Sequence, residues 1–336
     1  MDKRTSEIGR RALRGERLSR PDVLALTEAA GRCPFDLLYW AHRLRTARFG
    51  GAVRLCSIAA GKLGGCGEDC KFCAQSARHG GDYAQPKRTP PEEIRAAAAD
   101  AAANKAASFG IVNAGRSPTQ GELDDVIAAG EGVRADGPAG VSLCASLGAL
   151  TPEQAGRLAE AGFRRYNHNL ETSRRFFPQL VSTHGYDDRL RTLAAARQGG
   201  LSLCCGGIFG VGETWDDRVD LALTIRDEVR PDVVPLNFLH PIPGTPLAGA
   251  RPLPPTEALA VIAVFRLVLP DVDLKIAGGR EKNLRDLQSW MFYAGATSCL
   301  IGNYLTTLGR SAAEDLRMIA DLGLEVVKEL PTGGPA

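Results

Sequence analysis

The sequence lacks the features of several large classes of protein. It has no run of about 18 apolar residues, so no transmembrane helix is predicted. Its 41 basic and 39 acidic residues leave a net charge of +2, which gives no reason to expect binding to nucleic acid or to an anionic membrane. The N-terminus, Met1–Glu7, lacks the apolar core of a secretory signal. We therefore expect a cytoplasmic protein that acts on small molecules.

The nine cysteines need a different explanation from disulfides, because a reducing cytosol keeps thiols free for metals or catalysis. Three of them, Cys66, Cys70 and Cys73, have the spacing C-x3-C-x2-C. No fourth cysteine follows nearby, and the second C-x2-C or H-x3-H pair of most zinc sites is missing. The pattern predicts a cubane iron–sulfur cluster whose fourth iron is open to a bound molecule. A zinc knuckle is the alternative.

Short apolar runs alternate with longer helical segments after residue 50, which predicts an α/β fold. The predicted strands are Val53–Ile58, Ser108–Asn113, Gly140–Cys144, Arg164–Asn169, Ser202–Gly206, Val233–Leu236, Leu274–Ala277 and Cys299–Gly302. Eight such units indicate a (βα)8 TIM-type barrel over residues 51–327, with an N-terminal helical extension over residues 1–50 and a frayed tail over residues 328–336. A doubly wound open sheet is the competing layout.

Unusual polar and sulfur residues fall near the carboxyl ends of these strands, where such barrels form their active sites. They are Cys56, Asn113, Cys144, Asn167, Asn169, Cys204, Cys205, Asn237, Lys275, Thr306 and Thr307, in chain order from the first strand to the eighth. Their common location predicts a single catalytic face.

Several of these stretches leave two interpretations open. Tyr166–Ser173 would bury two asparagines and a glutamate, at a cost of roughly a few kcal/mol unless they are hydrogen-bonded, so it is either a ligand-binding ladder or a loop with a helix cap. Gly206–Thr214 does not match G-x-G-x-x-G and suggests close approach of a ligand to the backbone. Cys204 and Cys205 are neighbours, so one can bind a metal while the other packs. For Arg189, the alternative to a ligand-binding role is a surface ion pair.

Together these segments resemble the biotin synthase family of the radical S-adenosylmethionine (SAM) superfamily over residues 35–327. The segments that carry the resemblance are the cysteine loop with Ala74–Ser76, Tyr166–Ser173, Gly206–Thr214, Val234–Asn237, Gly244–Leu247, Gly278–Glu281 and Tyr304–Thr307. The resemblance implies conversion of dethiobiotin to biotin by radical sulfur insertion, with a [4Fe–4S] cluster, SAM and an auxiliary iron–sulfur cluster. It also implies a flavodoxin or ferredoxin-type electron donor and a homodimer.

The resemblance also implies a role for individual residues. The [4Fe–4S] ligands would be Cys66, Cys70 and Cys73. SAM would be bound by Phe72, Asn113, Asn169, Glu171, Arg189 and Ile208. Dethiobiotin would be bound by Asn167, Asn169, Asn237, Thr306 and Thr307. A neutral urea ring suits amide partners, and a carboxylate tail accepts hydrogen bonds from hydroxyls.

The chain departs from the family pattern at the auxiliary cluster, which in the well-known form is [2Fe–2S]. Gly110 and Lys275 stand where that form has a cysteine and an arginine ligand. The hypothesis is a four-iron auxiliary cluster, resembling that of an anaerobe-associated branch, and its candidate ligands are Cys56, Cys144, Cys204 and, with least support, Cys205. The sequence lacks two of the usual ligands but has two additional thiols. This change indicates a different cluster rather than loss of the cluster site.

Two other functions are alternatives to this one. Hydrogenase-maturation and methylornithine-forming enzymes resemble the chain in barrel and SAM loop, but they would not need Asn167, Asn237 and the two threonines together. An iron–sulfur electron carrier or a zinc-stabilised binding module would leave a barrel of roughly 250 residues without a purpose.

Overall fold

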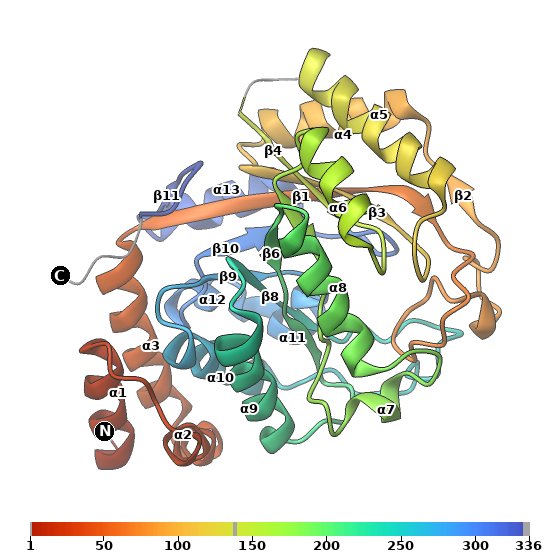
Figure 1. Ribbon diagram of the computed structural model, residues 1–336. Coiled ribbons are helices and arrows are strands. Elements are labelled where there is room, and N and C mark those ends of the chain that lie inside the picture. Colours follow the sequence, from red (N-terminus) through yellow and green to blue (C-terminus); the bar gives the residue numbers. More distant parts are fainter. Residues whose placement is uncertain (1, 137–139, 332–336) are drawn as a thin grey trace.

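The computed structural model describes residues 2–136 and 140–331, and its centre is a closed barrel of eight parallel strands (Figure 1). The strands are β1 (Ala52–Leu63), β3 (Ser108–Asn113), β4 (Ser142–Ser146), β5 (Arg165–Asn167), β6 (Ser202–Cys204), β8 (Val233–Phe238), β9 (Asp273–Ile276) and β10 (Ser298–Leu300). The barrel closes because β1 pairs with β10 as well as with β3. The predicted (βα)8 class is therefore confirmed, and the open sheet is wrong.

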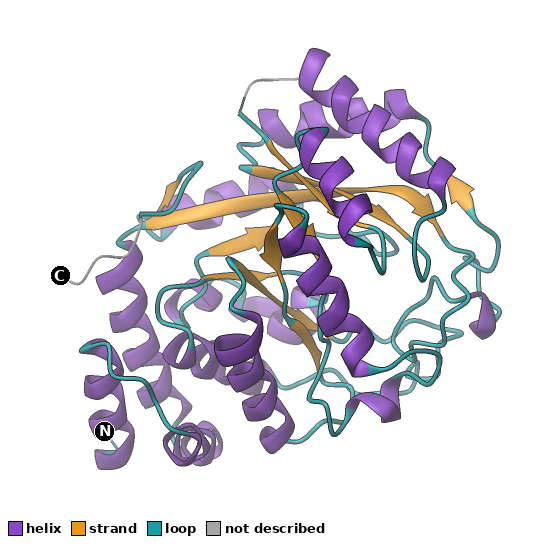
Figure 2. Cartoon of the chain, in the orientation of Figure 1, coloured by secondary structure: helices purple, strands orange, loops and turns teal. Residues whose placement is uncertain are grey.

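Helices cover the outside of the barrel (Figure 2). They are α4 (Pro91–Ala103), α5 (Gln120–Asp136), α6 (Pro152–Glu160), α7 (Phe177–Leu180), α8 (Tyr186–Gln198), α9 (Trp215–Thr224), α10 (Pro255–Val268), α11 (Arg280–Leu284), α12 (Trp290–Tyr293) and α13 (Ala312–Asp321). Capping boxes at Thr151, Thr214 and Ser311 fix the starts of α6, α9 and α13, because each hydroxyl accepts a backbone N–H of the first turn. None of the helices in the described residues is long and apolar enough to cross a bilayer.

Three helices precede the barrel and pack against its side: α1 (Lys3–Leu13), α2 (Arg20–Arg32) and α3 (Pro34–Phe49). Helix α3 lies along α10, which is why α10 is apolar and buried on nearly all sides. At the other end of the chain, β11 (Glu325–Val326) pairs with the start of β1, and the Lys328 ammonium donates to Ala106 O at 2.8 Å. Residues 332–336 of the predicted tail lie outside the described residues.

The structure differs from the predicted elements in three places. Strand β1 runs on to Leu63 because the short strand β2 (Lys87–Arg88) pairs with its end. The sequence also predicts a helix over residues 285–294, and this is wrong, since a 3-10 turn at Arg285–Leu287 and the single turn of α12 replace it. The fifth barrel strand is interrupted, so that β6 and β7 (Gly207–Phe209) pair with β8 in one common register.

That interruption results from a close approach of two strands. A Cβ atom on Gly206 would lie 1.9 Å from the carbonyl oxygen of Pro235 on β8, so only glycine fits there. The backbone of the fifth strand is thereby free to bind the segment that follows β5. The positions of the loop residues at the catalytic face depend on this approach of Gly206 to Pro235.

Candidate active site

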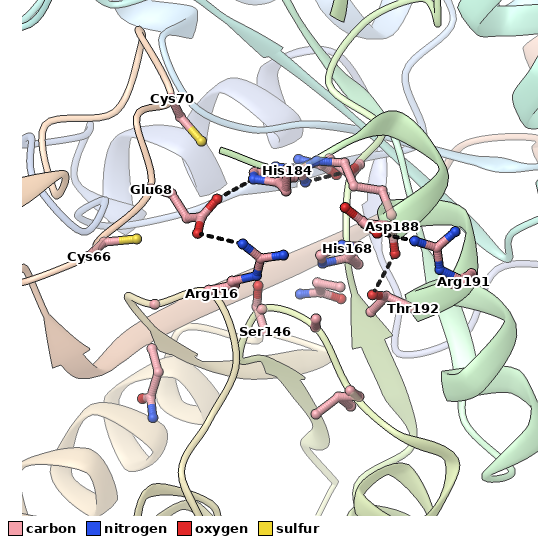
Figure 3. A pocket seen from close by; sticks show the side chains of 18 of the residues that line it. Cys66, Glu68, Cys70, Arg116, Ser146, His168, His184, Asp188, Arg191 and Thr192 are labelled. Atoms are coloured by element: carbon pink, nitrogen blue, oxygen red, sulfur yellow. Dashed lines mark hydrogen bonds and ion pairs between the residues drawn. The ribbon is translucent and has the colours of Figure 1, made fainter. Parts of the chain in front are cut away.

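A cavity of about 810 Å³ opens at the carboxyl ends of β3, β4 and β5, between the cysteine loop and α8 (Figure 3). Nine of the residues predicted from the sequence line it: Cys66, Phe72, Cys70, Cys73, Asn113, Asn167, Asn169, Glu171 and Arg189. Residues far apart in the chain thus meet around one space large enough for a nucleoside-sized ligand.

The three thiols of the cysteine loop surround part of this cavity. Burial raises the pKa of Cys70 to about 12 and that of Cys73 to about 11, so both thiols are protonated until a metal replaces the proton. Across residues 2–136 and 140–331, no three His, Cys, Asp or Glu side chains converge closely enough to hold a single metal ion. The three thiols line one cavity, an arrangement that suits a multi-iron cluster.

Two acidic residues inside the cysteine loop fasten it to the segment after α7. The Asp69 carboxylate accepts from the backbone N–H groups of Ser182 at 2.9 Å and Thr183 at 3.2 Å, and from both hydroxyls. Glu68 accepts from the Thr183 hydroxyl at 2.6 Å and contacts His184. These hydrogen bonds lower the pKa of Asp69, although burial alone would raise that pKa. Asp69 therefore stays ionised.

This clasp of Glu68 and Asp69 was missed from the sequence, because its partners lie more than a hundred residues away. Figure 3 shows Glu68 between His184 and Arg116, whose guanidinium lies 3.8 Å from the carboxylate. In the sequence alone, nothing next to His184 indicates this contact. The Glu68-Asp69 pair between two ligand cysteines was the available signal, since adjacent acidic residues beside buried thiols need hydrogen-bond donors.

An Asp69→Asn variant is expected to lose its cluster at least about tenfold faster. Hydrogen bonds to a charged group contribute roughly 1.5–3 kcal/mol, and each 1.4 kcal/mol is about a factor of ten. Iron release to a chelator, followed by absorbance under anaerobic conditions, measures the rate. Asp82→Asn changes an exposed carboxylate near the loop and serves as the control. Equal rates for both variants would show that the clasp does not hold the loop.

The segment after β5 forms a second wall of the cavity. The Asn169 side-chain oxygen accepts from Gly206 N at 3.1 Å, and its backbone carbonyl accepts from Arg189 at 2.8 Å. Arg189 is buried and lies 3.6 Å from Glu171, while Asp187 and Asp188 pair with other arginines. The surface ion pair left open for Arg189 is therefore wrong.

Glu171 occupies an unusual backbone position on this wall. Its φ is +69°, a left-handed conformation that Ile208 supports by donating its N–H to the Glu171 carbonyl at 2.8 Å. Burial raises the pKa of the Glu171 carboxyl, and Arg189 lowers it in part. The strained backbone and the paired carboxylate together present Glu171 to the cavity.

Four of the residues predicted to bind SAM or dethiobiotin do not line this cavity. Ile208 supports the cavity wall only through its backbone N–H, which binds the Glu171 carbonyl. Asn237 donates to Gly207 O at 3.2 Å and accepts from Gly278 N at 3.0 Å, so its amide bridges two strand ends. Thr306 and Thr307 are half-buried in the loop after β10.

A second group of thiols lies inside the barrel. Cys56, Cys144 and Cys204 are all buried, and the Lys275 ammonium lies 3.6 Å from the Cys56 sulfur. Burial raises the pKa of Cys144 to about 11, an effect that nearby Cys56 adds to and that Arg165 and Lys275 oppose. These interactions indicate that the three thiols and the two cations surround one interior space.

Gly110 on β3 borders this interior. A Cβ atom there would lie 3.2 Å from Ile58 and 3.8 Å from the Asn167 amide nitrogen, with the Cys144 Cβ at 3.9 Å. A side chain at this position would press on Ile58, so its absence lets β3 pack closely beside Asn167 and Cys144.

The structure does not bring Cys205 into this group. Successive residues of a strand point to opposite faces, and Cys205 lies in the hydrophobic core outside the barrel, near Tyr186. Burial there raises its pKa. The candidate ligand set is accordingly corrected to Cys56, Cys144 and Cys204.

A closed barrel with a C-x3-C-x2-C loop at its carboxyl face defines the radical SAM class of enzymes. The Radical SAM superfamily model matches residues 62–225, and the Biotin and Thiamin Synthesis associated domain matches residues 235–325. The chain is 49% identical to the biotin synthase of Trichlorobacter lovleyi over 95% of both chains. It is 47% identical to that of Heliobacterium modesticaldum, over 93% of this chain and 95% of the relative. This chain belongs to the biotin synthase family.

Membership of this family implies a [4Fe–4S] cluster and SAM. Among solved structures, the [FeFe]-hydrogenase maturase HydG matches with a TM-score of 0.82 and 17% identity, over 97% of this chain and 76% of that one. Methylornithine synthase (PylB) matches with a TM-score of 0.79 and 19% identity, over 95% and 97%. At these identities the likeness concerns the fold alone.

Proposed function

We propose that this protein converts dethiobiotin to biotin, the last step of biotin biosynthesis, by radical SAM insertion of sulfur. The observation that carries the proposal is the position of Asn167. Its side chain lines the cavity beside the cysteine loop and also lies next to Gly110, which adjoins Cys144. A substrate ring held by Asn167 therefore lies between the SAM site and the thiols inside the barrel.

Cys66, Cys70 and Cys73 would hold the [4Fe–4S] cluster, which would supply the electron needed for radical chemistry with SAM. The residues of this chain bind and orient the reactants. Arg189 and Glu171 present one cation and one carboxylate to the charged and hydroxyl groups of SAM. Phe72 and Asn113 line the same cavity, and Ile208 holds Glu171 in place.

The substrate side of the cavity suits a neutral urea. The Asn167 side-chain oxygen is buried without a hydrogen-bond partner, as is that of Asn113. An unpaired buried amide oxygen costs roughly 1–3 kcal/mol unless a ligand donates to it. A urea N–H is such a donor. Asn237 positions the strand ends beside this site, and we assign Thr306 and Thr307 to the carboxylate tail of dethiobiotin.

An Asn167→Leu variant, similar in size, is expected to raise the KM for dethiobiotin about 10- to 100-fold, since it removes both the acceptor and the donor of the amide. Initial rates of biotin formation measure this change. SAM cleavage without dethiobiotin is the internal control and is expected to stay unchanged. An unchanged KM would remove Asn167 from the substrate site.

We further propose that Cys56, Cys144 and Cys204 hold a four-iron auxiliary cluster as the sulfur source. Held by these three thiols, such a cluster would supply a sulfide for transfer to the substrate. The two clusters together give about eight irons per chain. About four irons in the reconstituted protein would contradict a second cubane.

The other parts of the proposal rest on the family. They are a flavodoxin or ferredoxin-type electron donor, a homodimer and a cytoplasmic location, with the barrel spanning residues 51–327 and the helical extension spanning residues 1–50.

An anaerobic assay of the reconstituted protein with SAM, dithionite and dethiobiotin tests the proposal. Formation of both 5′-deoxyadenosine and biotin is expected. Deoxyadenosine without biotin, in protein that contains both clusters, would reject dethiobiotin as the substrate.

A further inference from the structure

Two cations point into the barrel beside the three interior thiols, and neither forms an ion pair with a carboxylate of residues 2–136 or 140–331. Lys275 is buried, and its ammonium donates to the Cys56 sulfur at 3.6 Å. Arg165 pairs in register with Cys144 on β4, and its Nε is buried without a hydrogen-bond partner. Both residues alternate with outward-facing neighbours on their strands, which directs them to the interior.

Asp232 and Asp273, the two carboxylates whose charges act on Arg165, are both engaged by other groups, and Asp232 accepts from Leu203 N at 2.9 Å. Asp273 lies 3.0 Å from Arg54 and accepts from the hydroxyls of Thr297 and Ser298 at 2.8 and 2.7 Å. A buried cation without an anionic partner costs several kcal/mol. The chain nevertheless places the buried Lys275 and the half-buried Arg165 around one space, so the missing anion belongs to a ligand of that space.

An iron–sulfur cluster on three thiolates is such an anion, because the thiolates and inorganic sulfides together outweigh the charge of the irons. A further sulfide on the fourth iron adds more negative charge. The planar guanidinium of Arg165 offers several N–H donors, and sulfide accepts hydrogen bonds from donors of this kind. One cation beside Cys56 and a second beside Cys144 would hold such a cluster from two sides.

We propose that Arg165 and Lys275 form a cationic clamp that retains the auxiliary cluster and its sulfide, with Arg165 as a positioning residue for the sulfide that is transferred. This inference rests on the proposed function, since it requires the auxiliary cluster. Neither residue forms a bond in the reaction. Their effect is electrostatic, so it is visible in properties of the cluster itself.

Arg165→Met and Lys275→Met remove the charges at similar length, and Arg165→Lys restores one. We expect both methionine variants to keep the irons of the SAM cluster and to lose sulfide and iron from the auxiliary site. What auxiliary cluster they retain is expected to be harder to reduce, with a reduction equilibrium at least about tenfold less favourable. This is about 59 mV for one electron in a titration followed by electron paramagnetic resonance. Arg165→Lys is expected to recover most of the change.

The metal-free protein separates this role from a structural one. Removing an unpaired buried cation stabilises the protein or leaves it unchanged, so the Tm of metal-free Arg165→Met is expected to equal or exceed that of the parent. A lower Tm would mean that Arg165 serves the fold, and the clamp would be rejected. Wild-type sulfide content and potential in both methionine variants would also reject it. A parent protein with only the SAM cluster would instead reject the proposed auxiliary cluster.

Discussion

A Cys204→Ala variant is expected to cleave SAM but to form no biotin. Cys204 lies with Cys56 and Cys144 inside the barrel, apart from the cysteine loop that serves SAM. Loss of one of three thiol ligands removes the auxiliary cluster, so the iron content falls from about eight to about four per chain. Biotin formation is expected to fall below detection, while deoxyadenosine is still produced. Iron analysis and chromatography of both products measure the two effects.

The adjacent residue offers a matched control. Cys205→Ala removes the same atom from the next position, but that thiol lies in the core outside the barrel. Only a small cavity results, with a loss of roughly 1 kcal/mol of stability and full iron content. If Cys205→Ala lost the auxiliary cluster and Cys204→Ala kept it, the ligand set would be wrong.

The second large effect is expected for Cys70→Ala, which removes a ligand of the SAM cluster. Both deoxyadenosine and biotin should then be lost, by at least about a thousandfold, which is well within the acceleration that enzymes supply. The auxiliary cluster is expected to remain, so about four irons are still bound. The product assay and iron analysis described above apply here too.

Cys33→Ala is the control for Cys70→Ala, since Cys33 is a half-buried thiol between α2 and α3. It should leave both products and the iron content unchanged. SAM cleavage by Cys70→Ala at the parent rate would contradict the assignment of the cysteine loop.

Much of the fold could be predicted because its signals are local. Apolar runs of strand length alternate with capped helices, and this order alone favours a barrel or a doubly wound sheet. The closure that distinguishes the two depends on pairing between Cys56 and Leu300, which are far apart in the chain. The break at Gly206 depends on its approach to Pro235, so it also lies beyond local pattern.

The same distinction between local and long-range signals applies to the candidate site. The cysteine spacing is local and was evident, whereas the clasp of Asp69 with Ser182 and Thr183 depends on tertiary contacts. Arg165 was overlooked because arginine in a strand usually faces solvent. Its spacing of two from Asn167 was the usable signal, since residues two apart share a face of a strand. The same alternation predicts that Cys204 and Cys205 face opposite sides of their strand.

The most direct test of the account is the origin of the sulfur in the product. The protein would be reconstituted with sulfide carrying a heavy sulfur isotope, freed of excess sulfide and given SAM, dithionite and dethiobiotin for one turnover. Mass spectrometry of the biotin is expected to show the heavy isotope, and Cys204→Ala loaded in the same way should give no biotin. Unlabelled biotin from the parent protein would contradict a sulfur source inside the barrel.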